Sequence, residues 1–362
     1  MYNLQFHHII YENSYILTQN GYYNIEDLYN DYTDNNNLNS HKQNKFKIWN
    51  GNDWVLIKIK QNTEDFNIIY KILLSDGCEL LCSKNTYLNI IKINEFDLSQ
   101  EINNIKIVDL KIDYLLNTYN FPLIDGDCKD NILYPYTHGY YCGCMNKLDG
   151  HKDELRFESN LIYINLIVDK QKLKSKIEIC GKYSFDKNKN SLTGLLKVDM
   201  EKNIQTPING SIENKLLWLS GLIDNNGFIT KLCDAKYLNI SVLSKKFAME
   251  IKFLFNTLGI NPNIYLKNNI RKFKTDSGKI DEIIKHCWVI KLNADETNKI
   301  FLKSEFDLKT YYLNYDKNIY SIDQDINRFI YIKKINQIKL KKSSYIIENI
   351  NSYVINGVLI SN

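Results

Sequence analysis

The chain has 362 residues, of which 44% are hydrophobic and 24% are charged. These proportions are those of a folded globular protein, so a largely disordered chain is excluded, and the length allows two or three domains. Lys and Arg total 46 against 42 Asp and Glu, a formal charge of +4, so a polyanionic partner has to be argued from local clusters of charge.

Export and membrane insertion are disfavoured by the sequence. No apolar run reaches the roughly 18 residues that a spanning helix needs. The first 20 residues lack the basic start and apolar core of a signal peptide. The eight cysteines are scattered, without a CxxC pair or a zinc-type quartet. We therefore predict a protein with no membrane partner and with reduced thiols, in the cytoplasm or nucleus.

The first third of the chain alternates short β-type runs with polar turns. Residues 54–60 alternate apolar and polar side chains, as a half-buried strand does. Residues 68–74 and 79–82 flank a turn at 75–77 in the same way. The Asn-rich stretch at 34–39 is predicted to be a surface loop. We predict a hairpin-built all-β module here.

Helix-period segments appear among the strands between about residues 133 and 308. Residues 216–223 are apolar on nearly every side, which predicts a helix buried on several sides. Residues 245–258 repeat apolar side chains at helical spacing, and Gly259 suits a helix C-cap.

Strand character returns after Phe329. Residues 345–350 and 353–360 are predicted strands, and the pair Asn356 and Gly357 interrupts the second with a hairpin turn. The pattern as a whole predicts a β module that is split by an α/β insertion.

Five stretches, in order along the chain, carry a resemblance to a known family. They are SYILTQNGYYNIEDL (14–28), LLSDGCELLCSKNTYL (73–88), PYTHGYYCGC (135–144), LLWLSGLIDNNG (216–227) and SSYIIENINSYVINGVLISN (343–362). Together they resemble an intein, the self-splicing Hint fold, with an embedded LAGLIDADG (DOD-type) homing endonuclease. The third and fourth stretches look like the two endonuclease helices.

The resemblance implies an α+β fold in which a mostly-β Hint module is split by a pseudo-symmetric endonuclease domain. The Hint parts would be residues 1–130 and 315–362, and the endonuclease-like domain residues 131–314. It also implies double-stranded DNA as a partner, a host protein flanking the insert, and a monomer with an internal pseudo-two-fold axis.

The splicing blocks lack most of the groups that the family uses. Its first residue, a nucleophile that converts an amide into an ester or thioester, falls near Ile9. Its second-block Thr and His are Ser83 and Thr86, and a hydroxyl does not shuttle a proton near pH 7 as imidazole does. Asn362 keeps the amide that would attack its own carbonyl, but Ser361 replaces the preceding His. A purely structural role for Ser83, Thr86 and Asn362 is the alternative.

The two helix motifs keep the small residues that close helix packing needs. Gly139 and Gly143 in the first motif, and Ser220 and Gly221 in the second, stand where the family's helices cross.

The carboxylates that end the family's two helices are absent. In the family this pair binds Mg²⁺, which activates water and stabilises the leaving oxygen. The aligned positions here are Cys144 and Asn226. A thiol is a soft ligand and an amide has no charge, so Mg²⁺ binding should be weak. Asp224 should point away on a 3.6-residue helix, and Asp149 lies beyond the site, so either one could replace the acids only after a register shift.

DNA binding could outlast cleavage, because phosphate contacts need only basic side chains at the rim of a sheet. Residues 261–274 contain no acid, and a second basic stretch covers residues 328–342. An edge strand protected by Lys is the alternative for both, and is favoured for the second. The candidate DNA-binding residues are Lys267, Arg271, Lys272 and Lys274.

The leading hypothesis is an intein-derived homing endonuclease in which both site-specific cleavage and splicing are impaired while DNA affinity remains. Mg²⁺ is expected as a cofactor only if cleavage survives. The alternative is a non-enzymatic DNA-binding or regulatory protein on the same scaffold. A third hypothesis is a C-terminal cleavage element that acts through Asn362. The histidines His138, His151 and His286 show no metal-ligand spacing and are assigned structural roles.

Overall fold

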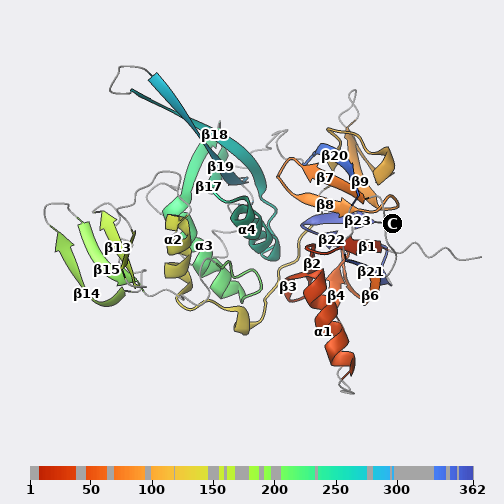
Figure 1. The fold of residues 1–362 in the computed structure, drawn as a ribbon, viewed down its shortest axis with the longest axis horizontal. Coiled ribbons are helices and arrows are strands. Elements are labelled where there is room, and N and C mark those ends of the chain that lie inside the picture. The colour runs from red at the N-terminus through yellow and green to blue at the C-terminus, as the bar shows by residue number, and fades with distance from the viewer. Residues whose placement is uncertain are drawn as a thin grey trace, which may run out of the picture. The chain divides into compact units, whose positions relative to one another are not determined.

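The computed structural model describes residues 8–37, 46–62, 69–93, 99–117, 119–145, 155–158, 161–167, 179–186, 191–196, 205–232, 235–274, 280–293, 296, 330–339, 343–348 and 350–361. These residues form an α+β structure in which strands predominate over four α-helices, and all of its strand pairs are antiparallel (Figure 1). The chain divides into two compact units. The terminal unit comprises Met1–Ile124, Asn256–Gly259 and Gln324–Asn362, and the central unit comprises Asp125–Phe255 and Ile260–Asp323.

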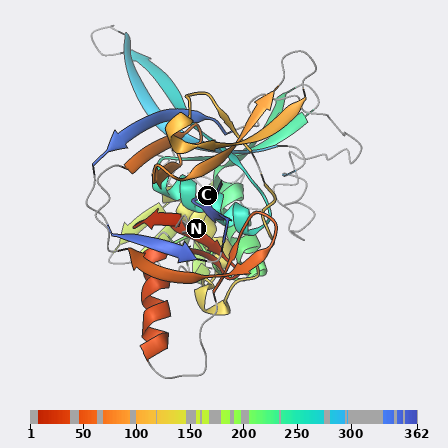
Figure 2. The same ribbon diagram turned by 90° about the vertical axis from the view of Figure 1, so that its right-hand side faces the viewer.

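The terminal unit combines strands from both ends of the chain. Strand β21 lies between β1 and β6, the pair β22 and β23 lies between β2 and β9, and β20 pairs with β7. Figure 2 shows these blue strands beside the red and orange strands of the first third. The strands are β1 (His8–Tyr11), β2 (Tyr15–Thr18), β3 (Gly21–Asn24), β4 (Lys47–Trp49), β5 (Trp54–Leu56), β6 (Lys58–Asn62), β7 (Ile69–Leu74), β8 (Glu79–Cys82), β9 (Tyr87–Ile93), β10 (Gln100–Lys106), β11 (Leu115–Leu116), β20 (Ile332–Ile338), β21 (Ser344–Glu348), β22 (Ser352–Ile355) and β23 (Val358–Ser361).

The predicted turn between β22 and β23 is confirmed. Asn356 and Gly357 have φ values of 50° and 78°, the left-handed conformations that a two-residue hairpin turn requires. The Asn356 Oδ1 accepts from the Tyr15 N–H at 2.8 Å, and its Nδ2 donates to the Glu79 carbonyl at 3.1 Å. The turn therefore fastens the hairpin to strands β2 and β8.

Helix α1 (Ile25–Asn37) overturns two predictions for the first third. The module is not all-β, and residues 34–37 are helical, while 38 and 39 lie outside the described residues. The helix begins after Asn24, whose Oδ1 accepts from the Glu26 N–H at 2.9 Å, and it buries Ile25 and Leu28. The capped and buried first turns extend into the Asn-rich stretch, which composition alone had suggested was a loop.

The predicted strand at 54–60 is in fact two strands in different sheets. Strand β5 pairs with β4, whereas β6 pairs with β21. Ile57 separates them, and its N–H donates to the Phe46 carbonyl at 3.2 Å. Apolar and polar residues continue to alternate through this break, so the sequence pattern could not reveal where one strand ends and the next begins.

The central unit contains the same arrangement twice. Helix α2 (Pro135–Met145) precedes a sheet of order β12-β13-β15-β14, and helix α3 (Ile212–Asn226) precedes a sheet of order β16-β17-β19-β18. In both sheets the third and fourth strands are exchanged relative to chain order, which indicates an internal repeat. The strands are β12 (Leu155–Glu158), β13 (Leu161–Ile167), β14 (Ile179–Asp186), β15 (Ser191–Leu196), β16 (Gly227–Leu232), β17 (Ala235–Val242), β18 (Asn263–Lys274) and β19 (Ile280–Leu292).

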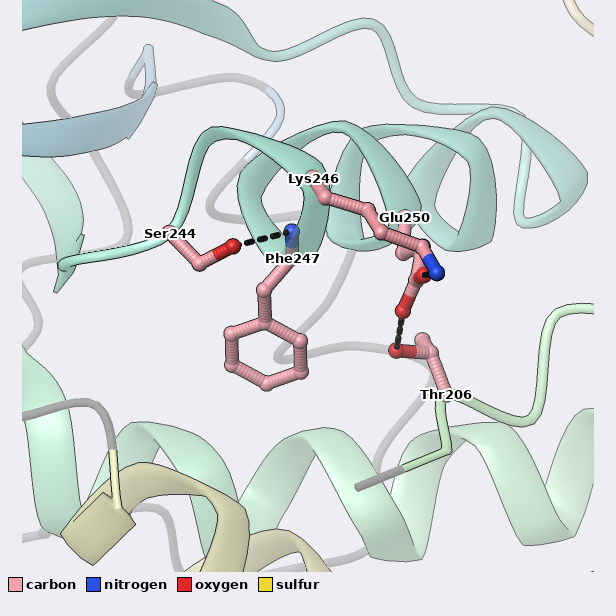
Figure 3. A network of polar contacts seen from close by, with 5 residues as sticks. All are labelled: Thr206, Ser244, Lys246, Phe247 and Glu250. Atoms are coloured by element: carbon pink, nitrogen blue, oxygen red, sulfur yellow. Dashed lines mark hydrogen bonds and ion pairs between the residues drawn. The ribbon is translucent and has the colours of Figure 1, made fainter.

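Helix α4 (Lys245–Thr257) confirms the helix predicted at 245–258. It is followed by Gly259 at φ 76°, as the predicted C-cap requires. At its start, Ser244 Oγ accepts from the Phe247 N–H at 3.3 Å, and one turn later Glu250 accepts from the Thr206 hydroxyl at 3.1 Å (Figure 3). The Phe247 ring meets the ring of Trp218 edge-on, which packs α4 against α3. Two short 3-10 helices cover Ile107–Asp109 and Cys128–Asp130.

No helix among the described residues is both long enough and apolar enough to cross a membrane. The six cysteines that can be described are free thiols.

Candidate functional site

Helices α2 and α3 cross at two glycines. A Cβ added to Gly139 would collide with the backbone carbonyl of Trp218, and a Cβ added to Gly221 would collide with that of Tyr136. Each glycine thus faces the residue three positions before the other glycine, so the contact is reciprocal. This confirms that small residues permit the close approach. Ser220 instead donates to the Leu216 carbonyl of its own helix at 2.8 Å.

Two buried polar contacts flank this crossing at equivalent positions. On one side the Tyr136 hydroxyl donates to Asp224 Oδ2 at 2.7 Å. On the other, Trp218 Nε1 donates to His138 Nδ1 at 3.0 Å, and the Cys142 Sγ lies 3.5 Å from the same nitrogen. Because Nδ1 accepts, His138 is neutral with its proton on Nε2. Asp224 is fully buried in the interface between α2 and α3, on a different face of α3 from the residue that ends the helix.

The helix ends hold Cys144 and Asn226, the two positions at which the resemblance predicts acids. Cys144 is half-buried near the end of α2, and Asn226 is the last residue of α3, with its Nδ2 donating to the Ser241 carbonyl at 3.2 Å. A third residue, Asn225, donates from Nδ2 to both Cys144 Sγ and the Tyr140 carbonyl. The structure therefore places the Asn225 amide against Cys144, whereas the Asn226 amide contacts strand β17.

This donor set does not fit Mg²⁺. Mg²⁺ sites are built on carboxylates, whereas the helix ends offer a thiol and two neutral amides. The amide nitrogens of Asn225 and Asn226 face acceptors, and their buried Oδ1 atoms have no hydrogen-bond partner. No group of three or more His, Cys, Asp or Glu side chains suited to a metal occurs within the described ranges. Asp149 lies outside those ranges.

The interior around the helix pair disfavours charge. Burial raises the pKa of the Cys142 thiol and that of the Glu250 carboxyl. Burial also lowers the pKa of Lys215 in α3 from 10.5 to about 8, although the Asp125 carboxylate opposes the shift. The Cys142 thiol therefore stays protonated and acts as a packing group rather than a nucleophile.

One face of the sheet formed by β16 to β19 carries several polar and aromatic side chains, together with Phe228, Cys287 and Val289. Asn239, Lys291 and Asn263 form a row across three strands. The Lys291 Nζ lies 3.9 Å from the centre of the Tyr237 ring, and Asn239 Nδ2 donates to Thr230 Oγ1 at 2.9 Å. On the opposite face Leu238, Ile240, Ile264 and Ile290 are buried, whereas Leu266 is exposed. We call this set the polar face: Thr230, Tyr237, Asn239, Asn263, Tyr265, Lys267 and Lys291.

Of the predicted DNA-binding residues, only Lys267 has a described side chain. It is exposed and belongs to the polar face, opposite Cys287. Arg271, Lys272 and Lys274 lie in the outer part of β18, and their side chains lie outside what the structure describes. The register places Lys272 opposite Glu282, so this end of the hairpin also carries acids from β19. Residues 261–274 themselves contain no acid, so the acids opposite them could be identified only from the strand pairing.

The splicing-type positions gather in the terminal unit. Ser83 and Thr86 lie in the turn between β8 and β9, buried, with their hydroxyl oxygens 3.2 Å apart. The next residue, Tyr87, pairs with Ser361, whose hydroxyl donates to Asn104 Oδ1 at 2.9 Å. Asn362 lies outside the described residues. The hydroxyls satisfy each other, which is the behaviour expected of the structural alternative.

Sequence reasoning missed Asn225 and most of the polar face. The alternation of polar and apolar residues at 237–242 was available as a signal for the face. No comparable signal identified Asn225, because its role depends on its proximity to the other helix.

No family model matches the chain. It is 23% identical over 354 residues to the ribonucleoside-diphosphate reductase large subunit of Invertebrate iridescent virus 6. That match covers 95% of this chain and 34% of the viral protein, so the chain spans about a third of the relative's length. A crystal structure of the N-terminal LAGLIDADG domain of DUF199/WhiA is similar at a TM-score of 0.29 and 11% identity, over 50% of this chain and 87% of that domain, a score too low to carry an argument.

Proposed function

We propose that the chain is an intein-like insert whose central unit binds double-stranded DNA without cutting it. The observation that carries this proposal is the reciprocal glycine crossing of α2 and α3, with a sheet of the same strand order after each helix. The two halves, each a helix followed by a sheet of the same strand order, would be related by a pseudo-two-fold axis. Such a pair matches the two half-sites of a duplex, whose backbones are also related by two-fold symmetry.

The polar face supplies the chemistry that duplex recognition needs. Amide side chains such as Asn263 hydrogen-bond base edges, and lysines such as Lys267 and Lys291 contact phosphates. Neither kind of contact requires a metal. Cleavage by contrast needs anions that hold a cation, and Cys144 and Asn226 supply none at neutral pH. We therefore propose binding as the retained activity and cleavage as the lost one.

The terminal unit is proposed to be the Hint-type splicing scaffold. Its first and last strands share sheets, so the two ends of the chain enter one folded unit, as an insert within a host protein requires. Similarity between nearly this whole chain and one third of a much longer reductase subunit supports an insertion into a protein of that kind. With Thr86 and Ser361 in place of histidines, splicing is expected to fail.

A binding experiment tests the proposal. The full chain is titrated, by fluorescence anisotropy, into a duplex that joins the host-gene sequences on the two sides of the insert's coding region. A shuffled duplex of equal composition is the control. We expect tighter binding to the joined sequence, with log affinity falling linearly as log salt rises. Equal affinity for both duplexes, or cutting of a plasmid that carries the joined site in Mg²⁺, would contradict the proposal.

Lysine variants locate the contact. Replacing Lys267 or Lys291 by Gln should lower the salt slope by about one each, because each loses one phosphate contact. The matched control is Lys246→Gln on α4, where the side chain is 86% exposed but does not belong to the polar face. If Lys246→Gln weakened DNA binding as much as Lys291→Gln does, the interface would lie elsewhere on the protein.

A further inference from the structure

Asn225 breaks the symmetry of the helix pair. It lies four residues after Gly221, and its equivalent, four residues after Gly139, is Gly143. Asn225 is 7% exposed and lies against Gly143, where an added Cβ would sit 3.0 Å from the Asn225 Cβ and 3.3 Å from its Nδ2. The space between the two helix ends is therefore filled from one side only.

Two acceptors of α2 fix the orientation of the Asn225 amide. Its Nδ2 donates to the Tyr140 carbonyl at 2.7 Å and to Cys144 Sγ, both in the last turns of α2. This is the negative end of the helix dipole. A flipped amide would bring Oδ1 against the Tyr140 carbonyl, so hydrogen bonding permits one orientation. The Oδ1 itself is buried without a hydrogen-bond partner, so the amide is held through its nitrogen.

We infer that Asn225 is a plug, whose amide NH₂ takes the place that a cation would occupy between the ends of α2 and α3. The inference rests on the proposed function, because it takes Cys144 and Asn226 as the positions of the family's acids. The inference predicts more than the loss of the acids at these two positions. An aspartate introduced at position 144 would accept the hydrogen bond that Cys144 accepts now, and the plug would still exclude a metal.

Calcium titration of the full-length chain tests this inference by calorimetry. The double variant Cys144→Asp/Asn226→Asp restores both acids and keeps the plug. The triple variant adds Asn225→Ala, the residue of the family pattern at this position. We expect the triple variant to bind Ca²⁺ at least about tenfold more tightly than the double, the range over which groups around a metal site change affinity. Equal affinities, or a folded triple variant that binds no Ca²⁺, would overturn the inference.

A second measurement needs no restored acid. In Asn225→Ala the Cys144 thiol loses its cover, so its alkylation by iodoacetamide should become several-fold faster than in the unaltered chain. The exposed Cys128 provides the internal reference. Asn226→Ala is the matched control variant, because the Asn226 amide donates to Ser241 and not to Cys144. An unchanged ratio of Cys144 to Cys128 labelling in Asn225→Ala would overturn the inference.

The two proposals fail in different ways. Absence of DNA binding by the unaltered chain would count against the proposed function and would leave the alkylation result unaffected. Normal DNA binding with equal Ca²⁺ affinity in the double and triple variants would leave that function standing and remove the plug.

Discussion

The crossing of α2 and α3 and the ends of the same helices lie one turn apart, yet they meet different requirements. At the crossing the requirement is shape, and both glycines satisfy it. At the ends the resemblance predicts a pair of carboxylates, and Cys144 and Asn226 stand there instead. The difference has a physical basis. A bulky residue at the crossing would destabilise every folded molecule, whereas removing two neighbouring carboxylates relieves their repulsion. A scaffold can therefore persist after its chemistry has gone.

The largest expected effect breaks the crossing itself. Gly221→Ala places a methyl group against the backbone carbonyl of Tyr136, which cannot rotate away, so we expect a loss of about 3 kcal/mol or more in unfolding free energy. Gly143→Ala is the matched control, since its methyl group would meet the Asn225 side chain, and we expect a loss of about 1 kcal/mol or less. Urea unfolding followed by the fluorescence of buried Trp218 measures both. Equal losses would mean that the crossing is no more constrained than the ends.

The next effect tests the polar contacts beside the crossing. Tyr136→Phe removes the hydroxyl that donates to buried Asp224, and we expect a loss of about 1 to 2 kcal/mol, because a buried acceptor loses a hydrogen bond. Tyr265→Phe, on the polar face and 40% exposed, is the control and should stay within about 0.5 kcal/mol of the original chain. A double-mutant cycle with Asp224→Asn isolates the pair. No coupling between the two positions would show that the contact adds nothing to the helix interface.

A pH series probes the buried charge on α3. Burial lowers the pKa of Lys215 from 10.5 to about 8, so between these values the unfolded chain binds more protons than the folded one. Lys215 thus makes stability rise with pH across this window. The raised pKa of Cys82, about 12, acts with the opposite sign above its ordinary 9.0. The quantity to measure is therefore the difference in unfolding free energy between the Lys215→Met variant and the original chain. We expect this difference to grow by about 1 to 2 kcal/mol as the pH falls toward 8. A difference that does not change with pH would contradict the assignment.

The smallest effect concerns the splicing-type turn. Ser83→Ala leaves the buried Thr86 hydroxyl without its partner, and we expect a loss of about 1 kcal/mol. Combining it with Thr86→Val, which removes both hydroxyls, should recover most of that loss, because no polar group is then left unpaired. Thermal unfolding measures the pair. A double variant less stable than Ser83→Ala would mean that the Thr86 hydroxyl has a further role in the fold.

Sequence patterns predicted the features that depend on neighbours close in the chain. The helix at 245–258 and the Asn356 turn were found from spacing or residue type, and the crossing glycines from the resemblance of the two helix motifs. Features that depend on partners distant in the chain were not found from the sequence. Helix α1 was hidden by an Asn-rich composition. The acid opposite Lys272 emerged only from strand register, and Asn225 owes its importance to the last turn of another helix. The assignment of the two units to splicing and DNA binding remains a prediction.

The amide of Asn356 also bears on how the protein ages. An asparagine followed by glycine loses ammonia when the next backbone nitrogen attacks its side chain, and that attack needs a free amide. In Asn356 both amide atoms are engaged, one with Tyr15 and the other with Glu79. Asn20, which is also followed by glycine, is exposed. During storage we therefore expect deamidation at Asn20 before Asn356, detectable by peptide mass spectrometry, because Asn356 reacts only once the hairpin has opened.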